Sequence, residues 1–112
     1  MQSMADLIGG TLPGMKDSTF NQDIDNWNVA KVRSAARAFS SLKYFNAPLN
    51  AWDTSAVTDI REMFSKAIVF NQDLNAWDVS SATDIREMFS KARQFNQDLN
   101  AWDVSSATDI RE

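Results

Sequence analysis

The chain has 112 residues, of which 44% are hydrophobic and 23% are charged, so it can bury enough apolar surface for one folded domain. It contains neither cysteine nor histidine, which excludes disulfides, thiol and imidazole catalysis, and the usual zinc and haem ligands. The net charge of −4 argues against general nucleic-acid binding, and no apolar run approaches the roughly 20 residues of a membrane span.

Residues 1–19 have no counterpart in the repeated sequence that follows them. Ser3 is expected to cap a short helical turn that ends at Gly9-Gly10. The apolar residues of the segment suit an N-terminal cap that shields the first repeat. They are Met4, Leu7, Ile8, Leu12 and Met15. The alternative is a mobile leader, although the segment does not resemble a signal peptide because it lacks a basic start.

From residue 20 onward the sequence repeats every 25 residues. The copies occupy residues 20–44, 45–69, 70–94 and 95–112, and the last is incomplete. A fixed period in this range is typical of repeat units that bury their apolar sides against one another. We therefore predict that equivalent aromatic residues form buried ladders. We also predict an asparagine ladder that hydrogen-bonds the backbone groups of the loops. The alternative is that the asparagines bind a ligand. The ladder residues are Phe20, Phe45, Phe70 and Phe95, Trp27, Trp52, Trp77 and Trp102, and Asn21, Asn46, Asn71 and Asn96.

Within each repeat, the hydrophobic spacing predicts a short strand. Leu74, Trp77 and Val79 follow the pattern of the strand segment in a leucine-rich repeat, L-x-x-L-x-L. Side chains on a strand alternate between its two sides, so Trp77 and Val79 are expected to point one way and Asp78 the other.

The spacing then changes to that of a helix over residues 82–92, with Ser80 or Ser81 as its N-cap. Its apolar stripe is Ala82, Ile85, Met88, Phe89 and Ala92. On the outer side, Glu62–Lys66 and Glu87–Lys91 are expected to form i, i+4 ion pairs. The predicted fold class is an α/β solenoid, a right-handed leucine-rich-repeat-like coil with short parallel strands on one side and short helices on the other.

The string F-N-Q-D-L-N-A-W-D-V-S-S-A-T-D-I-R-E-M-F at residues 70–89 closely resembles the repeats of BspA-like surface proteins, which are relatives of leucine-rich-repeat proteins. The resemblance covers residues 20–112 and departs from the pattern at Asn28, Arg33-Ser34 and Ala47-Pro48. It implies a non-enzymatic protein-binding or adhesion scaffold at the cell surface or outside the cell, with a protein ligand and no cofactor. It carries no catalytic residues.

Equivalent residues of successive repeats are expected to lie above one another in columns. Three such columns, with small or acidic side chains, are expected on the outward side of the predicted sheet and form the candidate partner-binding surface. They are Ala51, Ala76 and Ala101, Asp53, Asp78 and Asp103, and Ser55, Ser80 and Ser105. Carboxylates stacked about 4.8 Å apart repel one another. Either a cation such as Ca²⁺ bridges them, or each accepts local hydrogen bonds. The absence of any calcium-loop spacing favours the local bonds.

The sequence contains one basic cluster, formed by Lys31, Arg33, Arg37 and Lys43. Arg37 occupies the column of Glu62 and Glu87, so the cluster either relieves acidic repulsion or contacts an anionic partner.

Identical repetition of the carboxylates argues against an active site, which normally breaks symmetry. We therefore expect no enzymatic activity.

The last repeat stops at Glu112, before the Met-Phe pair that earlier copies carry. Such an end is expected to expose an edge and apolar side chains. The alternative function is therefore a structural module that associates end to end into homo-oligomers, unless the chain is part of a longer array. A nucleic-acid-binding module at the basic first repeat ranks third.

Overall fold

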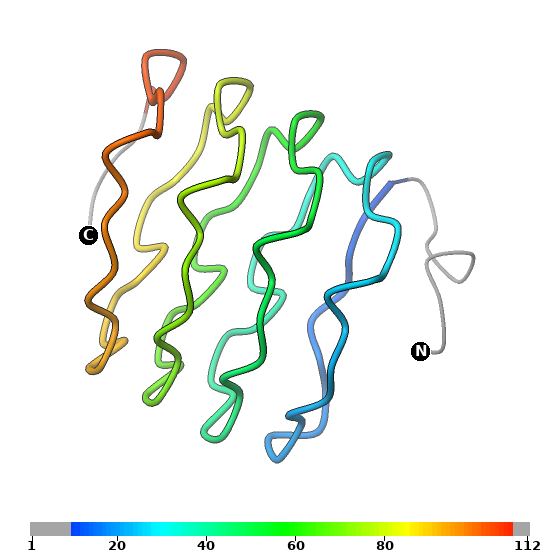
Figure 1. Ribbon diagram of the computed structural model, residues 1–112, viewed down its shortest axis with the longest axis vertical. Coiled ribbons are helices and arrows are strands. Elements are labelled where there is room, and N and C mark those ends of the chain that lie inside the picture. The colour runs from blue at the N-terminus through cyan, green and yellow to red at the C-terminus, as the bar shows by residue number, and fades with distance from the viewer. Residues whose placement is uncertain (1–9, 109–112) are drawn as a thin grey trace.

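The structure is a computed structural model that describes residues 10–108, and in it successive 25-residue units lie side by side in chain order (Figure 1). Hydrogen bonds join equivalent positions of neighbouring units, such as the 2.8 Å bond from the Asn71 N–H to Asn46 Oδ1. The Cα radius of gyration is 12.7 Å, close to the value of about 13 Å for a compact domain of 100 residues. The 25-residue period of the sequence therefore corresponds to one stacked unit.

The predicted α/β solenoid is wrong. Residues 10–108 contain no helix, and their β-type pairing is limited to isolated parallel bridges between Thr11 and Ser34, Ser34 and Asp59, and Asp59 and Asp84. The described chain is a compact body with little regular secondary structure, rather than a right-handed leucine-rich-repeat-like coil of strands and helices.

The segments predicted to be helical are runs of turns. In residues 60–67, alternate N–H groups donate to the carbonyl three residues earlier, with N···O distances of 3.0–3.2 Å from Met63, Ser65 and Ala67. The N–H groups between them donate to carbonyls of the next unit at 2.7–3.0 Å, from Ile60, Glu62, Phe64 and Lys66 to Asp84, Arg86, Met88 and Ser90. A helix would send each N–H four residues back. This alternation therefore binds the units together instead of closing a helix.

Left-handed backbone at two positions in each unit explains why no helix forms. Glu62 has φ of 52° and Lys66 has φ of 62°, and the equivalent residues Arg37, Ser41, Glu87 and Lys91 are also left-handed. Both occupy the third position of a turn, where a type II turn requires positive φ. The apolar side chains at helical spacing are still buried, as Ile60, Met63, Phe64 and Ala67 show. The spacing therefore predicted burial correctly and the backbone wrongly.

The segment predicted to be a strand, residues 74–79, is not extended either. The Trp77 N–H donates to the Leu74 carbonyl at 3.0 Å, which closes a turn. The neighbouring Ala76 N–H donates to Asn50 Oδ1 at 3.2 Å, and the Ser80 N–H to Asp78 Oδ1 at 3.0 Å. Short polar side chains here take N–H groups that a strand would give to backbone carbonyls. Ser80 therefore belongs to an aspartate turn and caps no helix.

Stacked phenylalanine rings fill the centre of the core. Phe45 stacks on Phe70 with ring centroids 5.7 Å apart, and Phe70 stacks on Phe95 at 6.0 Å. A second phenylalanine column, which is not among the predicted ladders, lies beside it, with Phe64 stacked 5.6 Å from Phe89 and 4.3 Å from Phe70. The two columns join each unit to its neighbours through continuous ring contacts.

The tryptophan column adds a polar link to its ring contacts. Trp77 lies 6.3 Å from Trp52 and 6.5 Å from Trp102, with the ring planes within 3°. Its indole N–H donates to the Leu49 carbonyl of the preceding unit at 2.8 Å. Trp27 is half-buried, and its ring has no stacked partner among residues 10–108.

Residues 10–19 pack against the first repeat. Leu12 is buried, and its N–H donates to the Ser34 carbonyl at 2.8 Å. The Met15 N–H donates to the Ala38 carbonyl at 3.1 Å, and the Met15 side chain is partly buried against the core. The helical turn predicted near Ser3, with Met4, Leu7 and Ile8, lies outside the described residues.

Truncation of Trp77 to alanine is expected to lower the free energy of unfolding by about 3–5 kcal/mol, because it removes a buried ring and its indole hydrogen bond. Trp27→Ala serves as the control and should cost clearly less, since that ring is half-buried. Urea unfolding followed by circular dichroism measures both. Equal losses would contradict the stacked tryptophan column.

Replacement of Glu87 by glycine is expected to raise the free energy of unfolding by about 0.5–1 kcal/mol, because left-handed backbone costs other residues more than it costs glycine. The exposed neighbour Ser81 has no positive φ, so Ser81→Gly should destabilise the chain. Thermal unfolding compares the two variants. A loss of about 1 kcal/mol for Glu87→Gly, as in a helix interior, would contradict the turn structure.

Candidate functional site

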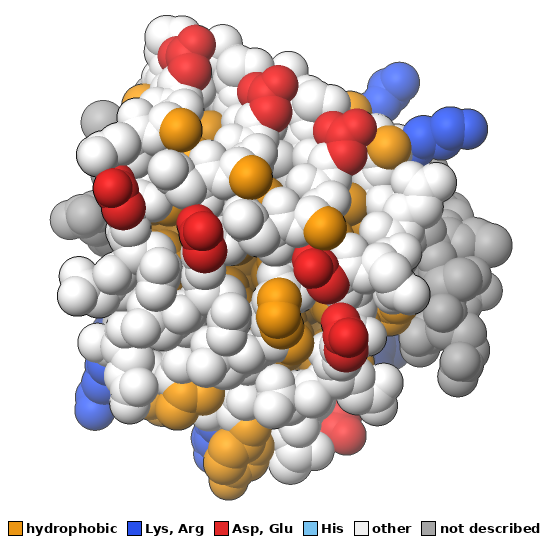
Figure 2. Space-filling model, in the orientation of Figure 1, with side chains coloured by type: hydrophobic (Ala, Val, Ile, Leu, Met, Phe, Trp, Pro, Cys, Tyr) orange, Lys and Arg blue, Asp and Glu red, His pale blue; other side chains and the backbone are white. Residues whose placement is uncertain are grey.

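One face of the stack is acidic. Its segments, residues 20–30, 45–57, 70–82 and 95–107, contain seven carboxylates and no lysine or arginine. Figure 2 shows these acidic side chains in rows across the units, with basic side chains only at the margins. The remaining described segments hold ten basic and five acidic residues, a balance of +5. We call the seven carboxylates the acidic face; they are Asp23, Asp25, Asp53, Asp73, Asp78, Asp98 and Asp103.

The predicted partner-binding residues belong to this face. The alanine and aspartate columns are exposed, as are Ser55 and Ser105, while Ser80 is partly buried. They form columns of exposed or partly buried side chains, as the sequence predicts, but they do not lie on a β-sheet within residues 10–108. The whole set is Ala51, Asp53, Ser55, Ala76, Asp78, Ser80, Ala101, Asp103 and Ser105.

Each aspartate of the stacked column accepts hydrogen bonds from the serine two residues later. Asp78 Oδ1 accepts the Ser80 hydroxyl at 2.6 Å and the Ser80 N–H at 3.0 Å. The bond from the Ser80 hydroxyl, followed in importance by the bond from its N–H, holds the pKa of Asp78 below its usual value. Burial and the neighbouring carboxylates act in the opposite direction. The pKa values of Asp53 and Asp103 are lowered in the same way by Ser55 and Ser105. Local bonds thus stabilise the carboxylate charges.

No group of three or more acidic side chains within residues 10–108 is placed to hold a metal ion. The carboxylates of the face recur at fixed positions of successive units, in separate columns, instead of converging on a point. The geometry thus favours local hydrogen bonds over a shared cation for the aspartate column.

The asparagine column links successive units through their loops. Oδ1 of Asn21, Asn46 and Asn71 accepts the N–H of the next asparagine at 2.8–2.9 Å, the last donor being Asn96. Gln97 also donates from Nε2 to Asn71 Oδ1 at 2.9 Å. The side-chain acceptors are therefore occupied by the neighbouring unit.

A second polar column was missed from the sequence. Oδ1 of Asp25, Asn50 and Asn75 accepts the N–H of Ala51, Ala76 and Ala101 at 3.0–3.2 Å. The signal was available, because every copy carries Asp or Asn at this position. These bonds fix the backbone of the alanine column on the acidic face.

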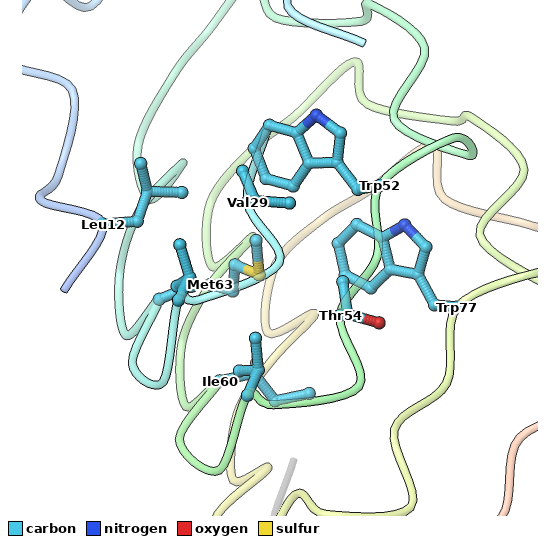
Figure 3. Close-up of a pocket in the computed structure, with 10 residues that line it drawn as sticks. Leu12, Val29, Trp52, Thr54, Ile60, Met63 and Trp77 are labelled. Carbon is cyan, nitrogen blue, oxygen red and sulfur yellow. The ribbon is translucent and has the colours of Figure 1, made fainter. Parts of the chain in front are cut away.

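An enclosed space in the core is too small for a ligand. Its volume is about 10 Å³, and its wall is apolar apart from Thr54. Figure 3 shows Trp52 and Trp77 on one side of it and Leu12, Met63 and Ile60 on the other. The Thr54 hydroxyl donates to the Asp78 carbonyl at 3.1 Å, so no polar group there calls for a ligand.

The basic cluster of the first repeat is partly compensated. The Arg37 guanidinium lies 2.9 Å from Glu62 Oε2, and its Nε donates to the same oxygen at 3.0 Å. Arg37 thus relieves the charge of Glu62 in the next unit, as one of the two sequence-based alternatives predicts.

The unit at residues 95–108 is more exposed than the one before it. Val104 is 42% exposed, whereas the equivalent Val79 is 3% exposed. Trp102 is also only partly buried. Apolar surface is therefore accessible at this side of the stack in the described chain.

These features define a repeat protein, built from stacked 25-residue units that bury aromatic columns and present one acidic face. The chain belongs to the family described as "Mycoplasma protein of unknown function, DUF285", whose model matches residues 10–112. No match to the chain was found among curated proteins or among solved structures. The residues described include no helix that is long and apolar enough to cross a membrane.

Removal of the Ser80 hydroxyl by Ser80→Ala is expected to raise the pKa of Asp78 towards its ordinary value, while the pKa of Asp53 stays low. Because the folded pKa lies below the unfolded one, the stabilisation is present above the unfolded pKa and is lost as pH falls through the folded pKa. Carbon-detected NMR titration measures both carboxylates. An unchanged Asp78 pKa in the variant would contradict the hydroxyl's role.

Proposed function

We propose that the chain is a non-enzymatic scaffold that binds a protein partner through its acidic face. The observation that carries the proposal is the row of exposed carboxylates, which contains no basic residue and is held by local bonds to serines. A surface of repeated, pre-positioned charges selects a complementary partner and speeds its association. An active site would instead require residues of different kinds to converge.

The resemblance to BspA-like leucine-rich-repeat surface proteins supports this function. That resemblance rests on the repeat sequence, and membership of the DUF285 family agrees with a repeat protein. We accordingly propose a place at the cell surface or outside the cell. Adhesion to a host or matrix protein is the form of binding that the resemblance suggests.

A triple variant, Asp53→Asn, Asp78→Asn and Asp103→Asn, tests the acidic face. Asparagine keeps the Oδ1 acceptor for the serine N–H, so the charges are removed while the turn is retained. Pull-down from host or matrix components, compared with the unmodified chain, should lose the partner. Retention of every captured protein by the triple variant would contradict binding through this column.

The neighbouring row provides the matched control. Asp23, Asp73 and Asp98 each accept the N–H two residues later, and their change to asparagine removes the same charge from the same face. If the control triple loses binding and the first triple does not, the contact lies on the row of Asp23, Asp73 and Asp98 rather than on the predicted columns.

The alternative function, end-to-end self-association, is favoured by the exposed Val104 and the partly buried Trp102. A second copy placed there would cover apolar side chains that inner units bury. Light scattering over a range of concentrations distinguishes the two functions. A chain that stays monomeric at high concentration and still captures a partner is a scaffold and not an assembly module.

A further inference from the structure

A shallow groove of about 240 Å³ crosses three successive units outside the acidic face. Two columns of exposed side chains line it: Ser41, Lys66 and Lys91 form one, and Lys43, Ile68 and Arg93 form the other. The members of each column are equivalent residues of neighbouring units, so the groove follows the stacking direction. Cations are present in both columns, and the lining contains no carboxylate.

The positive charge of the groove has no partner within the described chain. Lys66 was expected to pair with Glu62 across a helical turn, but Glu62 pairs with Arg37 of the preceding unit at 2.9 Å. None of the ion pairs formed within residues 10–108 involves Lys43, Lys66, Lys91 or Arg93. The absence of the helix therefore leaves Lys66 and Lys91 available to a ligand, beside Lys43 and Arg93.

Nearby arginines behave differently. Arg61 lies 3.6 Å from Asp59 and 3.9 Å from Asp84, and Arg86 lies 3.6 Å from Asp84. These pairs occupy the part of each unit that precedes the groove. Lys16, Lys31 and Arg33 outside the groove also form no ion pair within residues 10–108, but the groove brings four unpaired cations together along one line.

We propose that this groove binds an extended acidic peptide segment of a partner protein. Successive side chains of an extended peptide point to opposite sides with a rise of about 3.3 Å, so a run of Asp or Glu directs carboxylates to both cationic columns. Side chains on the same side recur at roughly 6.6 Å. Equivalent rings of neighbouring units lie 5.6–6.5 Å apart, which is close to that spacing.

The lining favours a peptide over a single-stranded nucleic acid. It contains no aromatic ring, whereas single-stranded nucleic acids are held by base stacking on aromatic side chains. Ile68 is 37% exposed and offers apolar contact to the methylene groups of acidic side chains. The groove is shallow and crosses three successive units along the stacking direction, a shape that suits a narrow linear segment.

This binding site is independent of the proposed function of the acidic face. The two surfaces share no residue, and they select partners of opposite charge. Loss of binding at one is therefore distinguishable from loss at the other.

Fluorescence anisotropy with labelled deca-glutamate and the 112-residue chain at low salt tests the proposal. The double variant Lys66→Gln and Lys91→Gln should weaken binding roughly three- to tenfold, because two exposed charge contacts are lost. Lys66→Arg with Lys91→Arg should retain binding. Lys16→Gln with Lys31→Gln removes the same charge outside the groove and should weaken binding less than twofold.

Three results would overturn the proposal. They are no binding of deca-glutamate by the unmodified chain, equal weakening by the control pair, and stronger lysine-dependent binding of a ten-nucleotide oligothymidylate or of heparin than of deca-glutamate. Melting temperatures of all variants show whether each remains folded. If the double variant Lys66→Gln and Lys91→Gln does not fold, Arg93→Gln takes its place. This variant loses one charge contact and should weaken the binding of deca-glutamate less than the double variant would.

Discussion

The structure depends on the pairing of backbone N–H groups between neighbouring units. A buried N–H without an acceptor costs as much as a lost hydrogen bond, and regular helices and sheets normally meet this requirement. Here the N–H groups of residues 60–67 are divided between turns and the next unit, and the Arg61 N–H is accepted by Asp59 Oδ1. Every unit therefore needs a neighbour to complete its backbone. Stability is consequently a property of the stack and not of a single unit.

The loop side of the stack meets the same requirement with side chains. Asn46 and Asn50 each provide an Oδ1 to the following unit, and Asp78 provides one to its own turn. Such side chains compete with regular structure, so they permit an irregular backbone to be repeated without strands. The asparagine ladder was predictable from the sequence, and the same 25-residue recurrence at Asp25, Asn50 and Asn75 marks the second polar column.

Much of the packing was predictable from the sequence because a 25-residue period places equal residues in columns. Phe45 and Phe70 stack, as do Trp52 and Trp77. The backbone was not predictable from the apolar spacing, since a series of turns and a helix bury residues such as Ile60 and Phe64 alike. Left-handed φ at a glutamate or a lysine has no compositional signal, as glycine would have. The acidic columns were visible in the sequence, whereas the basic groove was hidden by the ion pairs that a helix would have formed.

The left-handed positions also link the backbone to the surface. The side chains of Lys66 and Lys91 are exposed. The backbone N–H of Lys66 and that of the equivalent Ser41 both donate to a carbonyl of the next unit, so this bond does not depend on the side chain. Serine, lysine, arginine and glutamate all occupy such positions in this one chain. The charge of this edge can therefore change from unit to unit without altering the buried rings or the bonds between units. A stack built in this way separates the residues that hold it together from the residues on its surface, which suits the proposed function as a binding scaffold.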